Sequence, residues 1–225
     1  MDSGNEIITD TEMTTQIEPQ VPVNHYYNYE YDSMERFISY WHQIAELRVF
    51  KSKLILEIGI GNGFVANYLN DRGFQISTLD IDKNLKPDVC GSIIDIPFKD
   101  EAFHVVACFE VLEHLPFKNI NNALCEIYRV TTDYAILSLP DCNRAYRLDI
   151  QLPKFGSHKL LIPIPRLKPL IHSFDGEHYW EIGKSGYSIQ VIKDEIEKTG
   201  WFIDRTYRVF EVPYHRFFIL SKMHK

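Results

Sequence analysis

The chain has 225 residues, of which 45% are hydrophobic and 24% are charged, the composition of a globular protein with one core. No apolar run reaches the roughly 18 residues of a membrane-spanning helix, and no basic start followed by an apolar stretch indicates a signal peptide. We therefore expect a cytoplasmic protein, and the net charge of −7 disfavours nucleic acid as a general partner.

The cysteines lie far apart in the sequence, with no CxxC pair. This spacing excludes a zinc knuckle, and a disulfide framework is not expected in a chain of this size in a reducing compartment. We therefore expect four free, mostly buried thiols, at Cys90, Cys108, Cys125 and Cys142.

Residues 1–24 carry acidic side chains and no Lys or Arg, and they show no apolar pattern. That composition predicts a disordered acidic tail, followed by a single domain over 25–225. From Ser33 onwards apolar residues recur at intervals of three and four, which predicts an amphipathic helix with Ser33 as its N-cap. This helix would form an N-terminal cap on the domain.

Strand and helix signals then alternate along the chain. Residues 53–58 form a short apolar run that ends in glycines, which predicts a buried strand and a tight turn. Further strands are expected at 74–80, 88–90, 103–109, 134–139, 201–207 and 217–221, and helices at 64–72, 119–130 and 189–199. The alternation up to Pro140 predicts parallel βαβ units with helices on both faces of one sheet. The proline-rich segment 141–186 breaks it and is expected to be a lid-like insertion after the fifth strand.

The glycine turn runs from Glu57 through Gly59 and Gly61 to Gly63. Glycine allows a sharp turn and the close approach of a ligand, and the free N–H groups of the next helix point at the turn. A dinucleotide site would need a third glycine at position 64, where this chain has Phe64. The carboxylate of Glu57 would also repel a pyrophosphate, whereas it suits a ligand with a cationic amino group. Both features favour S-adenosylmethionine over NAD and leave a dehydrogenase as a minor alternative.

Asp80 ends the second predicted strand. A carboxylate at this position can accept hydrogen bonds from both hydroxyls of a ribose, as in the dinucleotide fold. Asp82 follows two residues later and is the second choice for that role.

Three segments in this order resemble one known family: LEIGIGNG, then TLDID, then GSIIDIPFKDEAFHVVACFEVLEHLP. Over about residues 50–140 the chain is similar to class I S-adenosylmethionine-dependent methyltransferases of the type 11 group (EC 2.1.1.-). The resemblance implies a doubly wound α/β fold, a Rossmann-like, mostly parallel seven-stranded sheet with the last strand antiparallel. It implies S-adenosyl-L-methionine as the methyl donor and S-adenosyl-L-homocysteine as the product. The donor contacts that it implies are Glu57, Gly59, Gly61, Gly63, Asp80, Ile81, Ser92, Ile93 and Phe109.

One position departs from the family pattern. Related chains often have Gly-Asp-Ala before Leu-Pro-Phe, with the Asp on the adenine amino group, but Ser92 stands in that place here. Ser92, a backbone group, or Asp95 from three residues further on would make the adenine contact.

Methyl transfer needs little from catalytic side chains. The leaving thioether is neutral and needs no acid, positioning can supply ~7–11 kcal/mol of the barrier reduction, and a base helps only a protonated acceptor. We therefore expect no metal. The candidates for a catalytic role are His114, Asp141 and His178.

The acceptor is expected beyond the carboxyl ends of the strands, where candidate contacts are Tyr31, Tyr40, Asn143 and Trp180. Residues 143–172 contain six basic residues against one acid, a net charge of +5, interleaved with apolar residues. This pattern predicts a lid for an anionic or lipid-like acceptor or a peripheral contact with a membrane surface, or a packed loop paired with the acidic body.

We expect a small-molecule acceptor with an O or N nucleophile. The alternatives are an RNA, protein or lipid-like acceptor, or a donor-binding subunit without turnover. A nucleic acid is disfavoured because no RNA-binding module is appended and FEVLEH stands where an NPPY-like tetrapeptide would follow the fourth strand. The sequence leaves the oligomeric state open.

Overall fold

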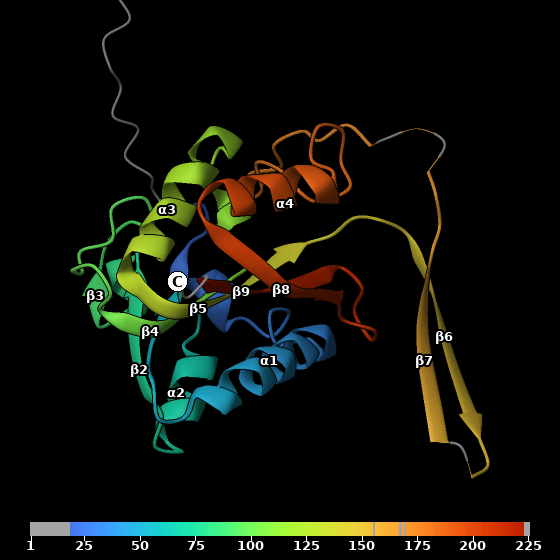
Figure 1. Cartoon of the computed structure of the whole chain (residues 1–225), viewed down its shortest axis with the longest axis horizontal. Helices are drawn as coiled ribbons and strands as arrows, with labels where there is room; N and C mark the ends of the chain where they lie inside the picture. Colours follow the sequence, from blue (N-terminus) through green and yellow to red (C-terminus); the bar gives the residue numbers. More distant parts are fainter. Residues whose placement is uncertain (1–18, 155, 167, 169, 223–225) are drawn as a thin grey trace, which may run out of the picture.

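The computed structural model describes residues 19–154, 156–166, 168 and 170–222. A seven-stranded sheet forms its centre, in the order β3-β2-β1-β4-β5-β9-β8 (Figure 1). The strands β3, β2, β1, β4 and β5 are parallel, and β9 is antiparallel to both of its neighbours. The predicted doubly wound, mostly parallel sheet with an antiparallel last strand is therefore confirmed. Its strands are β1 Leu54–Ile58, β2 Gln75–Asp80, β3 Val89–Cys90, β4 Phe103–Phe109, β5 Thr131–Pro140, β8 Trp201–Arg208 and β9 His215–Lys222.

Two pairs of helices cover the two faces of the sheet (Figure 1). Helices α1 (Met34–Leu47) and α2 (Phe64–Asn70) pack on one face, and α3 (Ile120–Val130) and α4 (Ile189–Lys198) on the other. Successive strand residues point to opposite faces, so Ile55 packs with α1 and α2 while Leu56 packs with α3 and α4. Burial on both faces explains why β1 and β4 read as continuous apolar runs rather than alternating ones.

The starts of the helices follow the signals in the sequence. The side chain of Ser33 accepts a hydrogen bond from the backbone N–H of Arg36, which is the capping that the sequence predicts for α1. Ser188 caps α4 in the same way, through the N–H of Val191. Short 3-10 helices complete the described elements: η1 Val23–Tyr27, η2 Arg48–Phe50, η3 Lys83–Leu85, η4 Leu112–His114 and η5 Phe117–Asn119.

The insertion after β5 contains regular structure that the sequence reading did not predict. Strands β6 (Ala145–Leu152) and β7 (Gly156–Pro163) form a separate antiparallel sheet. This hairpin projects from the side of the body (Figure 1). None of the described residues in 143–172 is among those that line the large pocket at the sheet edge, so the hairpin does not cover that pocket as the expected lid would.

Residues 1–18 of the predicted acidic tail lie outside the described part of the chain. Residues 19–24 are described, and the side-chain amide of Gln20 donates a hydrogen bond to the carbonyl of His114 over 3.2 Å. This part of the segment therefore lies against the domain. The four cysteines are free thiols, but the expectation that most are buried is wrong, since Cys90 and Cys125 are exposed and only Cys108 is buried. Among the described residues, none of the helices has the length and apolar character needed to cross a membrane.

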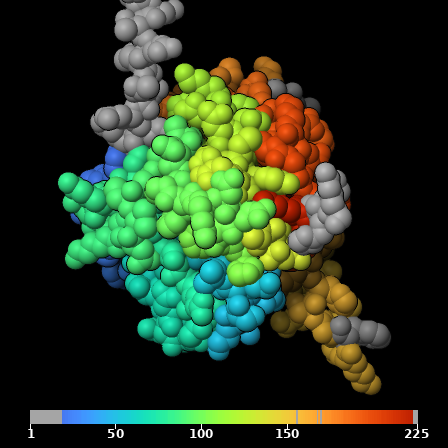
Figure 2. Space-filling view, turned by 60° about the vertical axis from the view of Figure 1, so that its left-hand side comes forward, coloured from blue at the N-terminus to red at the C-terminus, as the bar shows by residue number. Residues whose placement is uncertain are grey.

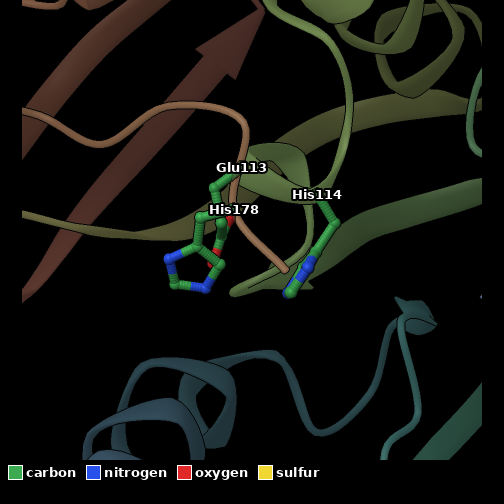
Figure 3. Close-up of side chains that lie close together, drawn as sticks. All are labelled: Glu113, His114 and His178. Atoms are coloured by element: carbon green, nitrogen blue, oxygen red, sulfur yellow. The ribbon is translucent and has the colours of Figure 1, made fainter. Parts of the chain in front are cut away.

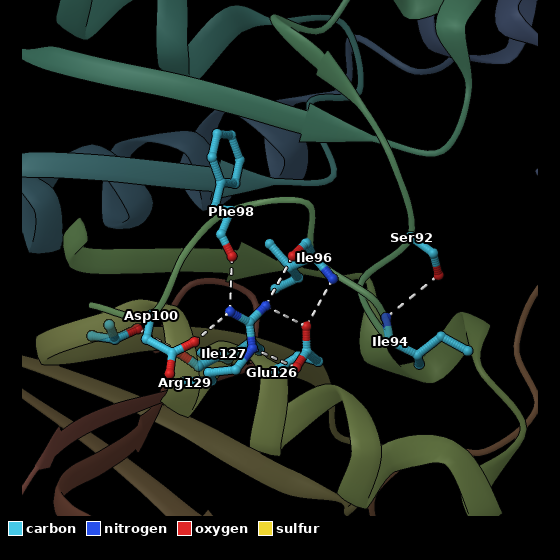
Figure 4. A network of polar contacts seen from close by, with 9 residues as sticks. Ser92, Ile94, Ile96, Phe98, Asp100, Glu126, Ile127 and Arg129 are labelled. Carbon is cyan, nitrogen blue, oxygen red and sulfur yellow. Dashed lines mark hydrogen bonds and ion pairs between the residues drawn. The ribbon is translucent and has the colours of Figure 1, made fainter. Parts of the chain in front are cut away.

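Arg129 on α3 holds the segment that follows β3 (Figure 4). Its guanidinium donates to the carbonyls of Ile96 (2.9 Å) and Phe98 (2.8 Å) and pairs with Glu126 and Asp100. Glu126 in turn accepts a hydrogen bond from the backbone N–H of Ile96. A single arginine thereby satisfies the backbone of an irregular loop whose first residues reach the sheet edge.

Replacing this arginine is expected to destabilise the fold. The change Arg129→Ala should lower the free energy of unfolding by about 2–3 kcal/mol, because two backbone carbonyls lose charge-assisted hydrogen bonds. Urea unfolding measures the loss. The matched control is Arg72→Ala, since Arg72 is exposed, bonds one carbonyl of its own helix and stacks on Tyr68. It should cost less than about 0.5 kcal/mol, and equal losses in the two variants would contradict the assigned role of Arg129.

Candidate functional site

A pocket of about 660 Å³ lies at the carboxyl ends of β1, β2 and β4. Parallel strands bring these ends to one edge of the sheet, the position where ligands bind in open α/β folds. The 3-10 helix η1, the pair Glu177 and His178, and the start of β9 also contribute to its lining. The lining thus draws on segments from Pro19 to His215.

The glycine turn forms one wall of this pocket. Gly59 and Gly61 line it, both with positive φ (81° and 55°). A Cβ on Gly59 would lie 2.2 Å from Cγ2 of Val111, so no side chain fits there. Gly63 also has positive φ (74°) and precedes the first residue of α2, but it does not line the pocket. The turn therefore presents bare backbone, which suits close approach by a ligand.

Glu57 lies beneath the turn rather than in the pocket wall. Its side chain is buried and accepts a hydrogen bond from the backbone N–H of Ala66 in α2. Burial raises the pKa of this carboxyl to about 8. Its second oxygen, Oε2, has no hydrogen-bond partner among the described residues. The structure thus ties Glu57 to the helix that follows the turn, while the predicted contact with a donor amino group stays a prediction.

Asp80 lines the pocket with its carboxylate already fixed. Oδ2 accepts from the N–H of Ile60 over 2.9 Å, and Oδ1 accepts from the N–H of Asp82 over 2.8 Å. Burial raises the pKa of this carboxyl, although these backbone hydrogen bonds act against the rise. A carboxylate has about four acceptor positions, so two remain for a diol. Asp82, the second choice, uses its Oδ1 to cap η3 through Asn84.

Four other predicted donor contacts line the same pocket: Ile81, Ser92, Ile93 and Phe109. Of the options for the adenine contact, Ser92 is on the wall, whereas Asp95 is exposed and is not part of it. The predicted donor set is therefore gathered at one place, except that Glu57 and Gly63 lie behind the wall.

The four residues predicted to contact the acceptor do not lie together. Tyr31 lines the pocket, in edge-to-face contact with Tyr26. The other three do not line it. The hydroxyl of Tyr40 donates to Asn62, the indole N–H of Trp180 donates to the carbonyl of Leu115 in the core, and Asn143 donates to Asp141. Sequence position alone could not show that these polar atoms are already satisfied elsewhere.

Asp141 is a buried structural anion rather than a pocket residue. It pairs with Arg216 at 2.7 Å and with Arg208 at 3.5 Å. The first arginine lies on β9 and the second on β8, so this cluster anchors the start of the insertion to the antiparallel end of the sheet. Asp141 does not line the pocket, so the structure gives no support to its predicted catalytic role.

His114 and His178 both line the pocket, with ring centroids 5.0 Å apart. Nδ1 of His114 lies 2.9 Å from the carbonyl oxygen of Glu177, and because a carbonyl only accepts, Nδ1 carries the hydrogen. Nδ1 of His178 lies 3.0 Å from a carboxylate oxygen of Glu181. Burial lowers the pKa of His114, and the nearby His178 adds to this. Burial also opposes the charge on His178, but the carboxylate of Glu181 outweighs it and raises that pKa.

Glu113 joins these two imidazoles in a compact group (Figure 3). One ligand atom from each of the three residues lies within 4.8 Å of the others. Glu113 is fully buried, its two carboxyl oxygens have no hydrogen-bond partner among the described residues, and burial raises its pKa well above the usual value. Two imidazoles and a carboxylate are a set that can hold a divalent transition metal. No metal is expected from the sequence, in which His114 and His178 lie 64 positions apart.

The sequence reading also missed an acid and a histidine that line the pocket together. Oε1 of Glu110, directly after β4, lies 3.4 Å from Nδ1 of His215, the first residue of β9. Burial works against the charge on Glu110, but His215 outweighs it and lowers the pKa of that carboxyl. Glu110 also has an unusual positive φ of 54°. Its place beside Phe109 could have marked it, whereas only the antiparallel pairing of β9 brings His215 there. Lining residues outside the predicted set of contacts also include Tyr26, Arg36, Glu177 and Tyr214.

Comparison with known proteins agrees with this geometry. Residues 56–139 match the family model described as a methyltransferase domain. An uncharacterized protein of Methanocaldococcus jannaschii is 37% identical over 94 residues, which cover 37% of this chain and 40% of that protein. The ubiquinone biosynthesis O-methyltransferase of Rickettsia bellii is 26% identical over 133 residues, which cover 52% of each. The chain thus spans about half the length, or less, of these curated relatives.

The fold is also found in solved structures. The 1,6-didemethyltoxoflavin-N1-methyltransferase of Burkholderia thailandensis, solved with 1,6-didemethyltoxoflavin and S-adenosylhomocysteine, aligns with a TM-score of 0.61. The alignment covers 90% of this chain and 85% of that one at 11% identity, so the likeness is one of fold. Together with the glycine turn and the strand order, the matched segment identifies a methyltransferase domain over residues 56–139, on a fold shared with S-adenosylmethionine-dependent methyltransferases.

Proposed function

We propose that this chain transfers a methyl group from S-adenosyl-L-methionine to an O or N nucleophile of a small molecule and releases S-adenosyl-L-homocysteine. The observation that carries the proposal is the single pocket in which the glycine turn, Asp80, Ser92 and Phe109 meet beside unassigned polar and aromatic side chains. One cavity would then hold both reactants, as in-line displacement requires.

The donor half of the pocket fits the predicted ligand in its chemistry. Asp80 would hold the ribose, since its carboxylate retains free acceptor positions. Ser92 and Ile93 would lie at the adenine, and Phe109 would lie alongside the nucleoside. The bare backbone of Gly59 and Gly61 would allow the methionine portion to approach closely.

The remaining walls support a small acceptor. The volume of about 660 Å³ lies within the range of small-molecule sites, roughly 300–1,000 Å³. The N-terminal segment contributes Tyr26, Tyr31 and Arg36, and the later part of the chain contributes Glu177 and Tyr214. An RNA, protein or lipid-like acceptor would have to insert a single group between these walls, and a donor-binding subunit without turnover would need no acceptor walls at all.

Glu110 and His215 are suited to accept a proton from the acceptor. The acceptor nucleophile attacks the methyl carbon, the carbon–sulfur bond breaks, and its electron pair stays on the neutral thioether. An acceptor hydroxyl or protonated amine must lose its proton in the same process. We assign that proton to His215, whose Nδ1 lies 3.4 Å from Oε1 of Glu110.

The assignment of Asp80 predicts the behaviour of a conservative variant. Asp80→Asn should weaken the binding of S-adenosyl-L-homocysteine by about 10–100-fold, because a hydrogen bond to a charged group contributes roughly 1.5–3 kcal/mol. Isothermal titration calorimetry measures the affinity, and thermal unfolding checks the fold. The matched control Asp95→Asn changes an exposed carboxylate outside the pocket and should leave the affinity unchanged. Equal affinities of the parent and Asp80→Asn would contradict the donor site.

Turnover separates the candidate functions. The parent chain should release S-adenosyl-L-homocysteine when labelled donor is added to a small-metabolite extract, and it should not label purified RNA or protein fractions. Label in a macromolecular fraction alone would contradict the small-molecule acceptor. Tight donor binding without label in any fraction would identify a donor-binding subunit.

The acid–base pair predicts a change in activity. Glu110→Gln should lower kcat/KM by about 10–100-fold, because His215 loses the carboxylate beside it. His215→Gln should lower kcat/KM at least as far, whereas His158→Gln on the exposed hairpin should leave it unchanged.

Stability gives a second readout that does not depend on turnover. The folded-state pKa of Glu110 is lowered, so its ion pair contributes stability above the ordinary carboxyl pKa, and that contribution disappears as the pH falls through the lowered value. The parent should therefore be more stable than Glu110→Gln above the ordinary carboxyl pKa. The difference between their free energies of unfolding, measured with urea, should disappear in acid. An unchanged kcat/KM in Glu110→Gln together with a stability difference that does not vary with pH would contradict the pair.

A further inference from the structure

The hairpin formed by β6 and β7 has no sheet neighbour. Its two eight-residue strands pair only with each other within the described residues. In both views it projects beyond the globular body (Figures 1 and 2). A two-stranded ribbon alone in water is marginally stable at best, so something is needed to bury one of its faces.

The register makes this ribbon strongly two-faced. Residues directly opposite one another lie on the same side, and the pairs Tyr146–Ile162 and Leu148–Leu160 place four large apolar side chains together. Ile150 and Leu152 continue the same face towards the tip, opposite His158 and Gly156. The exposed fractions of its large apolar side chains are Tyr146 68%, Leu148 41%, Ile150 42%, Leu152 47%, Leu160 55% and Ile162 43%. We call these six residues the apolar face.

The opposite face of the ribbon is turned towards the body. There Arg147 donates to the carbonyl of Glu211, and the ammonium of Lys159 pairs with the carboxylate of the same residue. The ammonium also lies 5.3 Å from the ring centroid of Phe210. Because this polar face contacts the connection between β8 and β9, the apolar face points away from the body.

The distribution of charge favours one kind of occupant. Among the described strand residues, the apolar side of the ribbon carries no Asp, Glu, Lys or Arg, so two copies could pack face to face without burying a charge. An anionic lipid surface would need cations beside the apolar residues, but Arg147 and Lys159 are bound to Glu211 on the other side.

We propose that the chain forms a symmetric homodimer in which the apolar faces of two hairpins pack against each other. The contact is self-complementary, with each copy contributing the same residues across a two-fold axis. Two ribbons stacked in this way would form a small sandwich with sheets about 10 Å apart. The inference does not depend on the proposed methyl transfer, because no described residue of the hairpin lines the pocket.

Sedimentation velocity over a range of concentrations tests the dimer. The parent chain should sediment as a dimer, and Leu148→Glu combined with Leu160→Glu should raise the dimer dissociation constant by about 100-fold or more, because two charges would enter an apolar contact. The matched control places the same two charges on the opposite face, as Gln151→Glu with Ser157→Glu, and should remain dimeric. An unchanged affinity of both variants for S-adenosyl-L-homocysteine would show that the body is intact.

The same variants distinguish a second copy of the chain from other partners of the apolar face. A parent chain that stays monomeric at every concentration, or a control pair that dissociates as readily as the apolar-face pair, would overturn the proposal. Flotation with vesicles that contain anionic phospholipid tests whether the apolar face binds lipid instead. A monomeric chain that floats with these vesicles, and ceases to do so with Leu148→Glu and Leu160→Glu, would assign the face to lipid and would also overturn the dimer.

Cross-linking gives the orientation. Leu148 is near the middle of the apolar face, so Leu148→Cys should cross-link to the same position of a second copy with a short bis-maleimide. Gln151→Cys, on the opposite face, should give only the background of the parent chain, whose Cys90 and Cys125 are exposed. Equal cross-linking at both positions would contradict face-to-face packing.

Discussion

The contact between Gly59 and Val111 is the constraint on which the pocket depends. The turn after β1 and the turn after β4 approach so closely that a Cβ at position 59 would lie 2.2 Å from a methyl carbon of Val111. This closeness brings the bare backbone of the first turn beside Phe109 and Glu110, which end and follow β4. Asp80, from the neighbouring strand, ties the same turn down through the N–H of Ile60. Three consecutive strand ends in the sheet thereby form one continuous wall.

Buried charges fix the segments that surround this wall. Glu181 accepts from His178, Tyr214, Cys142 and Lys184, and these partners hold its pKa far below the usual carboxyl value. It therefore joins the pocket-lining loop to the start of β9. Desolvation offsets most of the attraction between buried charges, so these contacts add little net stability. They hold the loop that carries His178 beside Tyr214, directly before β9.

The sequence predicted best those pocket residues that lie close together along the chain. The turn residues, Asp80, Ser92 and Phe109 all follow strands within one run of βαβ units, so spacing along the chain is enough to group them at one sheet edge. It was least informative where the pocket is closed by distant segments. His215 reaches Glu110 through the antiparallel insertion of β9 between β5 and β8, and His178 reaches His114 through a loop from the far side of an insertion. Trp180 and Tyr40 looked available in the sequence, but the folded chain satisfies their polar atoms elsewhere.

From the sequence we predicted the fold class and grouped most of the expected donor contacts at one sheet edge, because periodicity, glycine spacing and strand-end carboxylates are local properties of the chain. The folded structure was needed to show which acids and imidazoles line the same pocket, and that the insertion forms a two-faced ribbon away from it. The physical reason is that a side chain's role in these regions depends on which partner satisfies or buries it, and that partner can lie a hundred residues away. The alternation of Tyr146, Leu148, Ile150 and Leu152 was visible in the sequence, but the direction in which that face points was not.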